Sequence, residues 1–267
     1  MQSFVRKISF LAAAAALAFA ANSHAQDKGK EFTPSVGQEG KDVIWVPTPA
    51  ALVQKMLDMA KATTNDYLID LGSGDGITVI TAAKRGIRAL GVEYNPDMVE
   101  LSKRNAQKEG ATVASRAEFV RGDIFETDFS KATVLTMYLL PSLNLKLRPT
   151  ILNMKPGTRV VSHAFTMGDW TADQTENVEG RTAYLWIVPA KVDGNWRMEG
   201  GDLAFKQTFQ KIDGTAGGKA ISNGTLRGDM ISFSVDGRDY SGKVTGDRIE
   251  GTVKGSAAGK WSAARAK

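Results

Sequence analysis

Between Pro49 and Pro189 the hydrophobic residues alternate between helical spacing and short continuous runs. Short apolar runs bounded by glycine or polar residues are typical of buried strands, whereas longer periodic segments are typical of helices. The pattern predicts helices over residues 51–62, 77–85, 96–109 and 143–154, and strands over residues 67–71, 89–93, 117–121, 133–138 and 159–164. Because strands and helices take turns, we expect a doubly wound α/β domain with a parallel sheet over residues 42–189.

A different pattern begins after Pro189. Helical spacing disappears, more than half of the 27 glycines follow, and short alternating segments are separated by dipeptides that favour hairpin turns. These dipeptides are Asp193-Gly194, Asp213-Gly214, Asn223-Gly224 and Asp236-Gly237. Residues 225–233 and 243–251 also share the spacing x-[LV]-x-G-D-x-I, which predicts a Gly-Asp turn between two strands in each copy.

The glycine-rich region therefore predicts a small antiparallel β domain over residues 190–267, either a meander or a small open barrel. It carries no catalytic constellation. We interpret it as a packing or targeting appendage, and a substrate-recruiting module is the alternative.

The first 25 residues have the three parts of a secretory signal peptide. Arg6 and Lys7 give a positive start, residues 8–21 form an apolar run, and residues 23–25 form a small-x-small cleavage site. The apolar run is shorter than the roughly 20 residues that span a bilayer. We therefore predict an exported protein, periplasmic or secreted, and an uncleaved membrane anchor is the alternative. Residues 26–41 are polar, which predicts a flexible tether.

The composition limits the available chemistry. The chain has no cysteine, which excludes thiol nucleophiles, disulfides and cysteine-based metal sites. One of its two histidines, His24, lies in the predicted signal peptide, so a multi-histidine metal site is excluded and no metal is expected. The net charge of +5 falls to about +3 without Arg6 and Lys7, which is too mild to indicate a nucleic-acid partner.

The strongest motif is D-L-G-S-G-D-G at residues 70–76, between a predicted strand and a predicted helix. Glycines permit positive φ and a close ligand approach, and a helix N-terminus offers free N–H groups. A dinucleotide fold favours G-x-G-x-x-G, and position 77 is Ile, so a nicotinamide-dependent oxidoreductase is the weaker alternative. The spacing favours S-adenosylmethionine, whose ammonium group suits an acidic residue at the strand end. The candidate cofactor-binding residues here are Asp70, Gly72, Ser73, Gly74 and Gly76.

Two further strand ends carry acidic residues. Glu93 ends the second predicted strand, where a carboxylate can accept hydrogen bonds from a ribose diol. Asp123 and Ile124 follow the third, where the carboxylate can accept from an adenine amino group and the Ile side chain can cover the ring. Ordered acidic residues on three successive strand ends indicate a nucleoside-containing cofactor.

These motifs resemble the class I S-adenosylmethionine-dependent methyltransferases over residues 45–164. The runs L-I-D-L-G-S-G-D-G, G-V-E-Y-N-P and G-D-I-F are similar to the branch of mitochondrial protein-lysine methyltransferases that act on the c-subunit of ATP synthase and the adenine nucleotide translocase, with bacterial relatives. The resemblance implies a Rossmann-like fold, S-adenosyl-L-methionine as cofactor, and Asn95 of the E-x-N-P run as a further cofactor-binding residue. Ile77 stands where that branch has an Arg.

Methyl transfer depends mainly on alignment of the nucleophile with the sulfonium, so no dedicated base is required. The segment after the fourth predicted strand is where such folds present the nucleophile. We predict Tyr138 and Pro141 as the catalytic residues, the first facing the acceptor and the second stiffening the turn; a core aromatic is the alternative role of Tyr138. His163 is expected to be a hydrogen-bonded strand-end residue, with a proton acceptor as the alternative. Trp45 is expected to be a capping hydrophobic residue, and closure over the cofactor is its alternative role.

The sequence therefore predicts an enzyme that methylates a nucleophile, foremost a protein lysine or another amine. An exported methyltransferase would meet no obvious supply of its cofactor. The alternative is therefore an exported, non-catalytic module that binds an adenosyl ligand or an envelope partner.

Overall fold

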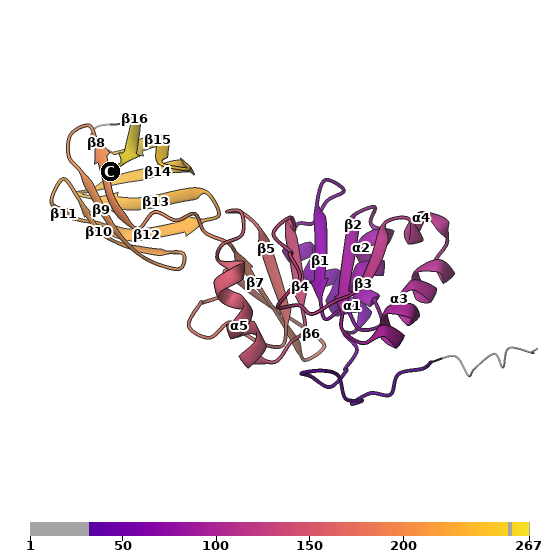
Figure 1. The fold of residues 1–267 in the computed structure, drawn as a ribbon. Helices are drawn as coiled ribbons and strands as arrows, with labels where there is room; N and C mark the ends of the chain where they lie inside the picture. Colours follow the sequence, from indigo (N-terminus) through magenta and orange to yellow (C-terminus); the bar gives the residue numbers. More distant parts are fainter. Residues whose placement is uncertain (1–31, 256–257, 267) are drawn as a thin grey trace, which may run out of the picture. The chain divides into compact units, whose positions relative to one another are not determined.

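The computed structural model describes residues 32–255 and 258–266. The predicted signal peptide and residues 26–31 of the predicted tether lie outside the described residues. The described residues from 33 onward form one compact unit. It contains an α/β sheet followed along the chain by an antiparallel barrel (Figure 1), which we call the sheet domain and the barrel. Within the described ranges, no helix combines the length and the apolar character needed to cross a membrane.

The sheet domain is built on seven strands in the order β3-β2-β1-β4-β5-β7-β6. Their bounds are β1 (Tyr67–Leu71), β2 (Arg88–Glu93), β3 (Ala117–Arg121), β4 (Val134–Met137), β5 (Arg159–His163), β6 (Gln174–Val178) and β7 (Arg181–Ile187). Strands β1 to β5 are parallel, whereas β7 is antiparallel to both of its neighbours. The strand order changes direction between β1 and β4, which is where open α/β sheets bind ligands. The predicted α/β fold is confirmed.

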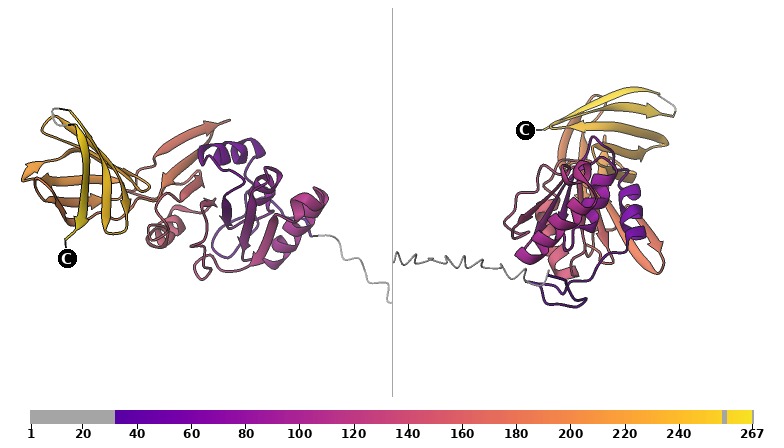
Figure 2. Two further views of the ribbon diagram at one scale, coloured as in Figure 1. Left: turned by 90° about the horizontal axis from the view of Figure 1, so that it is seen from above. Right: turned by 90° about the vertical axis from the view of Figure 1, so that its right-hand side faces the viewer.

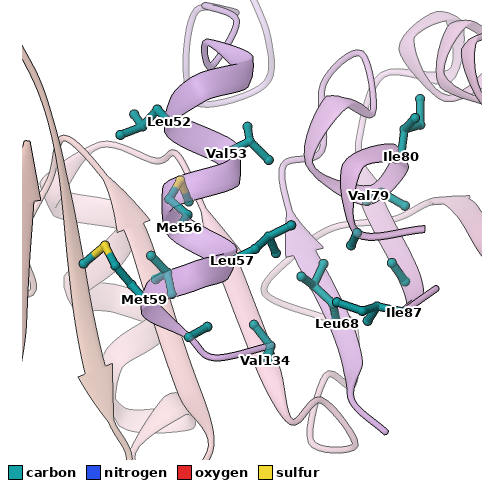
Figure 3. Close-up of a cluster of buried hydrophobic side chains, with 14 of the residues drawn as sticks. Leu52, Val53, Met56, Leu57, Met59, Leu68, Val79, Ile80, Ile87 and Val134 are labelled. Atoms are coloured by element: carbon teal, nitrogen blue, oxygen red, sulfur yellow. The ribbon is translucent and has the colours of Figure 1, made fainter. Parts of the chain in front are cut away.

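Helices cover both faces of this sheet. They are α1 (Ala50–Met59), α2 (Ile77–Lys84), α3 (Pro96–Lys108), α4 (Ala111–Ala114) and α5 (Pro141–Ile151). Successive strand residues point to opposite faces, so Leu68 packs with α1 and α2 in one core and Ile69 packs with α5 in the other. Figure 3 shows the first core, where side chains of α1 and α2 face the strand that carries Leu68. The two cores hold the carboxyl ends of β1 and β4 in fixed positions.

Three elements of the sheet domain were not predicted from the sequence. Strand β6 is an edge strand whose residues are mostly polar and partly exposed, so its hydrophobic pattern is weak. Strand β7 pairs with it across the hairpin turn at Glu179 and Gly180. Helix α4 is a single turn. Helix α5 also begins two residues earlier than predicted, because Pro141 occupies its first turn, where proline is favoured.

The barrel is a nine-stranded antiparallel sheet that closes on itself because β9 pairs with β10 (Figure 2). Its strands are β8 (Gly194–Met198), β9 (Leu203–Thr208), β10 (Lys211–Ala216), β11 (Lys219–Ala220), β12 (Ser222–Arg227), β13 (Met230–Val235), β14 (Arg238–Thr245), β15 (Arg248–Lys254) and β16 (Gly259–Arg265). Strand β11 pairs only with β10 and lies outside the ring of eight. The predicted small antiparallel domain is confirmed, as a closed barrel rather than an open one.

Two of the dipeptides predicted to form turns lie within strands instead. Asp213-Gly214 belongs to β10 and Asn223-Gly224 to β12. A Cβ at Gly214 would lie 1.8 Å from the carbonyl oxygen of Ala204, so glycine is required there by the close approach of β9. The repeated Gly-Asp dipeptides do connect hairpins, at Gly228 and at Gly246.

Candidate active site

A cavity of about 730 Å³ lies at the carboxyl ends of the parallel strands. Its lining combines residues at the ends of β1 to β4 with every residue from 38 to 48, a segment we call the strap. The strap is folded on itself, since the backbone N–H of Trp45 donates to the carbonyl oxygen of Gln38 at 2.9 Å. The last part of the predicted tether, residues 38–41, is therefore also part of the cavity wall.

The glycine loop between β1 and α2 turns the chain beneath this cavity. Gly72, Gly74 and Gly76 have φ of 77°, 55° and 84°, a region that favours glycine. A Cβ at Gly74 would lie 2.8 Å from Nε1 of Trp45, so the strap packs directly on the loop. Gly72, Ser73 and Gly74 line the cavity. The hydroxyl of Ser73 is buried and has no hydrogen-bond partner among the described residues.

Asp70, at the end of β1, is a buried carboxyl group on the cavity wall. Thr136, its register partner on β4, donates a hydrogen bond of 2.6 Å from Oγ1 to Oδ1 of Asp70. The pKa of Asp70 is raised to about 7, chiefly by burial and to a smaller degree by the nearby carboxylates of Asp75 and Glu93, while the hydrogen bonds from Thr136 and Thr78 lower it. A cation next to this group would favour its charged form.

Glu93 joins the end of β2 to the glycine loop. Its Oε2 accepts from the backbone N–H of Gly74 at 3.0 Å, and its Oε1 accepts from that of Asn95 at 2.9 Å. Asn95 caps α3, because its Oδ1 accepts from the backbone N–H of Asp97 at 2.9 Å. Both residues line the cavity, and each carboxylate oxygen keeps a second lone pair for a ligand.

Asp123 and Ile124, after β3, line the same cavity. Oδ1 of Asp123 accepts from the backbone N–H of Phe125 at 2.9 Å, and Oδ2 accepts from the ammonium of Lys41 in the strap. Lys41 also lies over the ring of Tyr94, 4.8 Å from its centroid. The hydrogen bond from Lys41, followed by that from Phe125, lowers the pKa of Asp123. Through Lys41, the strap thus contacts residues that follow both β2 and β3.

The opposite end of the cavity is aromatic. Tyr138 follows β4, and its ring stacks on the imidazole of His163 with centroids 3.8 Å apart and planes at 29°. Nδ1 of His163 lies 3.0 Å from Oγ1 of Thr48. Burial, and secondarily the charge of Arg181, lowers the pKa of His163 to about 4, so the ring is neutral near pH 7. No hydrogen bond of the Tyr138 hydroxyl is found within the described residues, which leaves it free to face a ligand.

Nine of the eleven site residues predicted from the sequence therefore line one cavity: Asp70, Gly72, Ser73, Gly74, Glu93, Asn95, Asp123, Ile124 and Tyr138. Gly76 and Pro141 lie outside the lining. A Cβ at Gly76 would lie 2.8 Å from the ring of Phe119, so this glycine permits packing of α2 on β3. Pro141 is exposed at the first turn of α5.

Among the residues of the cavity or its support that sequence reasoning missed are Lys41, Thr48, Thr136 and Phe165. Thr136 contacts Asp70 only because β1 and β4 are neighbours, and nothing in the local pattern of β4 indicates that pairing. A lysine, a threonine and a phenylalanine in loops carry no motif of their own. Their roles depend on the strap and the loop after β5 reaching the same strand ends.

Comparisons with known proteins point to one family. Residues 70–174 match the family model described as the ANTKMT methyltransferase domain. A protein-lysine N-methyltransferase from Saccharolobus islandicus (strain REY15A) is 42% identical over 153 residues, which cover 55% of this chain and 94% of that protein. The human lysine N-methyltransferase of the ATP synthase c-subunit is 31% identical over 143 residues, which cover 52% of this chain and 60% of the human protein.

A solved structure is similar as well. The crystal structure of an RNA methyltransferase from Salinibacter ruber in complex with S-adenosyl-L-homocysteine is 49% identical, with a TM-score of 0.53, and the match covers 55% of this chain and 96% of that chain. The names of these similar proteins therefore include both protein-lysine and RNA methylation. Their common feature is the methyltransferase activity.

The cavity fits S-adenosylmethionine on its own chemistry. It offers a buried carboxyl group at Asp70 for an ammonium, and the carboxylate oxygens of Glu93, whose remaining lone pairs can accept from a ribose diol. The chain therefore belongs to the class I S-adenosylmethionine-dependent methyltransferases, in the branch that contains the lysine methyltransferases of the adenine nucleotide translocase and of the ATP synthase c-subunit, with their archaeal and bacterial relatives.

Proposed function

We propose that this enzyme methylates the side-chain amine of a protein lysine. The observation that carries the proposal is the charge of the cavity lining. Its charged residues are six acids and one lysine, namely Glu39, Lys41, Asp42, Asp70, Asp75, Glu93 and Asp123. Even without the acids assigned to the cofactor below, Glu39, Asp42 and Asp75 keep the lining acidic. This charge attracts a cationic lysine and repels the phosphates of a nucleic acid, which proteins bind with lysine and arginine. The names of the archaeal and human relatives support the same acceptor.

RNA is the second candidate acceptor, because the Salinibacter ruber protein carries that name at 49% identity. An RNA acceptor would need a basic surface along its backbone and stacking space for a base. The aromatic end of the cavity could stack a base, but the single lysine at the lining, Lys41, is already paired with Asp123. The balance of charge therefore favours the lysine.

We propose that the cofactor lies across the strand ends. Asp70 binds the ammonium group, and Glu93 accepts from the ribose hydroxyls with the oxygen lone pairs that its backbone contacts leave free. Asp123 and Ile124 hold the adenine, with Asn95 beside Glu93. The strap covers the bound cofactor through Trp45, and the reactive methyl group then faces the aromatic end.

Bound S-adenosylmethionine supplies an electrophilic methyl group on a positively charged sulfur. The lysine nitrogen uses its lone pair to form the new N–C bond, the C–S bonding pair leaves with the sulfur, and one amine proton passes to water. Deprotonating a lysine near pH 7 costs roughly 4–5 kcal/mol in water. Tyr138 and the apolar side chains of Leu139, Leu140 and Leu143 lower that cost, because they remove the ammonium from water.

The decisive experiment offers both acceptor classes to the purified full-length chain. The protein is incubated with methyl-labelled cofactor and either a lysine-containing protein extract or total RNA, and the methylated residue is identified by mass spectrometry. We expect label on lysine and none on RNA. Asp70→Asn serves as the control that removes the ammonium-binding carboxylate and should abolish labelling. Label on RNA alone would refute the lysine proposal while leaving the methyltransferase activity intact.

We propose, in addition, that the chain is exported and that its signal peptide is removed. The support is the sequence of residues 1–25 alone. Mass spectrometry of the mature N-terminus tests it: a first residue near Gln26 is expected, and retention of Met1 would favour a membrane anchor.

A further inference from the structure

The loop that follows β5 makes a strained turn directly beside the aromatic end of the cavity. Ala164 has φ of 64°, which is rare for a residue with a Cβ. The backbone N–H of Phe165 donates to the carbonyl oxygen of His163, two residues earlier, at 2.8 Å. A hydrogen bond of this spacing around a residue of positive φ defines a γ-turn, which is uncommon because it is strained. Strain of this kind persists only where the surrounding structure maintains it.

The turn brings two rings to the same side chain. His163 precedes it and stacks on Tyr138, and Phe165 follows it and lies 6.0 Å from Tyr138 between centroids, with planes at 24°. Tyr138 and Phe165 both line the cavity. Residues two apart on an extended strand already point to the same face, so His163 and Phe165 would share a face without the turn. The γ-turn bends the chain between them, and the centroids of the two rings lie 3.8 Å and 6.0 Å from that of Tyr138.

Asn144 of α5 holds this turn from the other side. It is completely buried, and its Nδ2 donates to the carbonyl oxygens of Phe165 at 3.3 Å and Thr166 at 3.2 Å. Nδ2 also lies 3.4 Å from Oγ of Ser162. Oδ1 of Asn144 is buried and has no hydrogen-bond partner among the described residues. An unpartnered buried oxygen costs free energy of folding. The hydrogen bonds that Asn144 does make go to the loop, so we interpret its role as fixing the loop.

We propose that Phe165 is the second aromatic wall of the acceptor site, stacked with Tyr138, and that Asn144 and Ala164 are positioning residues that orient the Phe165 ring. The proposal rests on the proposed lysine function and deepens it. As the methyl group moves, positive charge passes to the acceptor nitrogen. Aromatic faces attract such a charge, so the wall stabilises the transition state and the methylated product more than the neutral amine. Loss of one ring face should weaken binding of an alkylammonium by about 3- to 30-fold.

The test uses the full-length chain loaded with S-adenosyl-L-homocysteine and n-butylamine as a lysine side-chain mimic. Saturation-transfer NMR measures n-butylamine binding, and calorimetry measures S-adenosyl-L-homocysteine binding. Phe165→Leu should weaken n-butylamine binding by about 3- to 30-fold and leave the affinity for S-adenosyl-L-homocysteine unchanged. Phe165→Tyr should bind n-butylamine as the wild type does. Phe129→Leu is the matched control, because Phe129 is a buried ring of the same domain outside the cavity lining.

Positioning by Asn144 is tested with Asn144→Asp, which keeps the size of the side chain and removes the donor to the loop. It should raise the KM for a lysine peptide several-fold with a smaller change in kcat, and the KM for the cofactor should not move. A parallel loss of cofactor affinity would instead assign Asn144 to the general stability of the fold, and would contradict its role.

The outcomes separate the two proposals. Equal n-butylamine binding by the Phe165→Leu variant and the wild type overturns the aromatic wall even if lysines are methylated. Failure of the wild type to bind n-butylamine also overturns it. If n-butylamine binding depends on Phe165 but no lysine is methylated, the aromatic wall is supported and the proposed protein-lysine acceptor is refuted.

Discussion

The sheet domain and the barrel both bring glycine into close contacts, but the neighbours differ. In the sheet domain, a Cβ at Gly74 would meet the indole nitrogen of Trp45 across the mouth of a cavity. In the barrel, a Cβ at Gly214 or Gly224 would meet the carbonyl oxygen of a neighbouring strand. Glycine therefore leaves room for a side chain of the strap beside the cavity in one domain, and for the backbone of a neighbouring strand in the other.

Buried polar groups show the same division. All the buried polar or charged residues found in the described parts of the chain lie between Thr48 and His163, in the sheet domain. The barrel core is apolar and aromatic, and its rings pack on one another, as Phe233 does on Tyr240 with centroids 4.9 Å apart. Because buried polar groups are costly unless they serve a purpose, the difference assigns the chemistry to the sheet domain and packing to the barrel interior.

The largest expected effect is a loss of stability in the barrel alone. Trp196 is fully buried in the barrel core, and its Nε1 donates to the carbonyl oxygen of Val192 at 2.7 Å. Trp196→Ala should lower the free energy of unfolding of the barrel by about 3–5 kcal/mol. Calorimetric unfolding and a titration with S-adenosylmethionine check it. Cofactor affinity should stay within about twofold of the wild type, and a parallel collapse of affinity would show that the barrel belongs to the cofactor site.

The next effect concerns His163, whose native pKa of about 4 lies below its unfolded value. The unfolded state then binds more protons between pH 6.5 and 4, so stability from this residue is complete above pH 6.5 and is lost, by about 3 kcal/mol, as the pH falls to 4. Asp70 acts in the opposite direction, because its pKa is raised to about 7 and the native state gains stability as the pH falls from 7. The two dependences largely cancel in the wild type.

Denaturant unfolding of Asp70→Asn should therefore reveal the dependence on His163. Its stability should fall between pH 6.5 and 4, whereas the double variant with His163→Gln should lose that part of the slope. Equal slopes in the single and double variants would show that His163 is not buried as a neutral ring. The barrel contains no histidine, so no histidine of the barrel contributes to the pH dependence of stability.

A third prediction compares one glycine from each domain. Gly74→Ala places a Cβ at positive φ and against Trp45, so cofactor affinity should fall about 30-fold, or about 2 kcal/mol. Gly224→Ala, whose Cβ would meet the carbonyl oxygen of Ile212, should lower the stability of the barrel and leave cofactor affinity unchanged. Calorimetric titration and thermal unfolding of both variants measure the two effects. Loss of cofactor affinity in the Gly224 variant would remove the distinction between the domains.

The same division explains how much the sequence could predict. Strands β1 to β5 were predicted within one or two residues, because each contains a short apolar run. The ends of the first three are also marked, since β1 and β3 are followed by glycine and β2 ends in Glu93. The motif residues on their ends meet at one edge, as parallel strands require. In the barrel, the dipeptides at Asp213 and Asn223 look like turns. Their glycines are explained only by the neighbouring strands, because a Cβ at Gly214 would lie 1.8 Å from the carbonyl oxygen of Ala204 and one at Gly224 would lie 2.1 Å from that of Ile212.

Contacts between distant segments could not be predicted. Thr136 reaches Asp70 through strand order, and Lys41 reaches Asp123 from 82 residues away through the fold of the strap. The γ-turn at Ala164 is invisible in the sequence because alanine carries no signal for positive φ. These positions depend on tertiary structure rather than on local pattern.

The smallest expected effect tests the charge of Asp70 itself. Burial raises its pKa to about 7, so near pH 6 most molecules carry a neutral Asp70 that attracts an ammonium weakly. Between pH 6 and 8 the charged fraction rises from about one tenth to about nine tenths, so affinity for the cofactor should increase about tenfold. Calorimetric titration in buffers of different ionisation heat should detect release of a proton on binding near pH 7, and Asp70→Asn should show neither the release nor this pH dependence. Affinity that is independent of pH in the wild type would mean that the ammonium does not pair with Asp70, and that the buried carboxyl group supports the glycine loop instead.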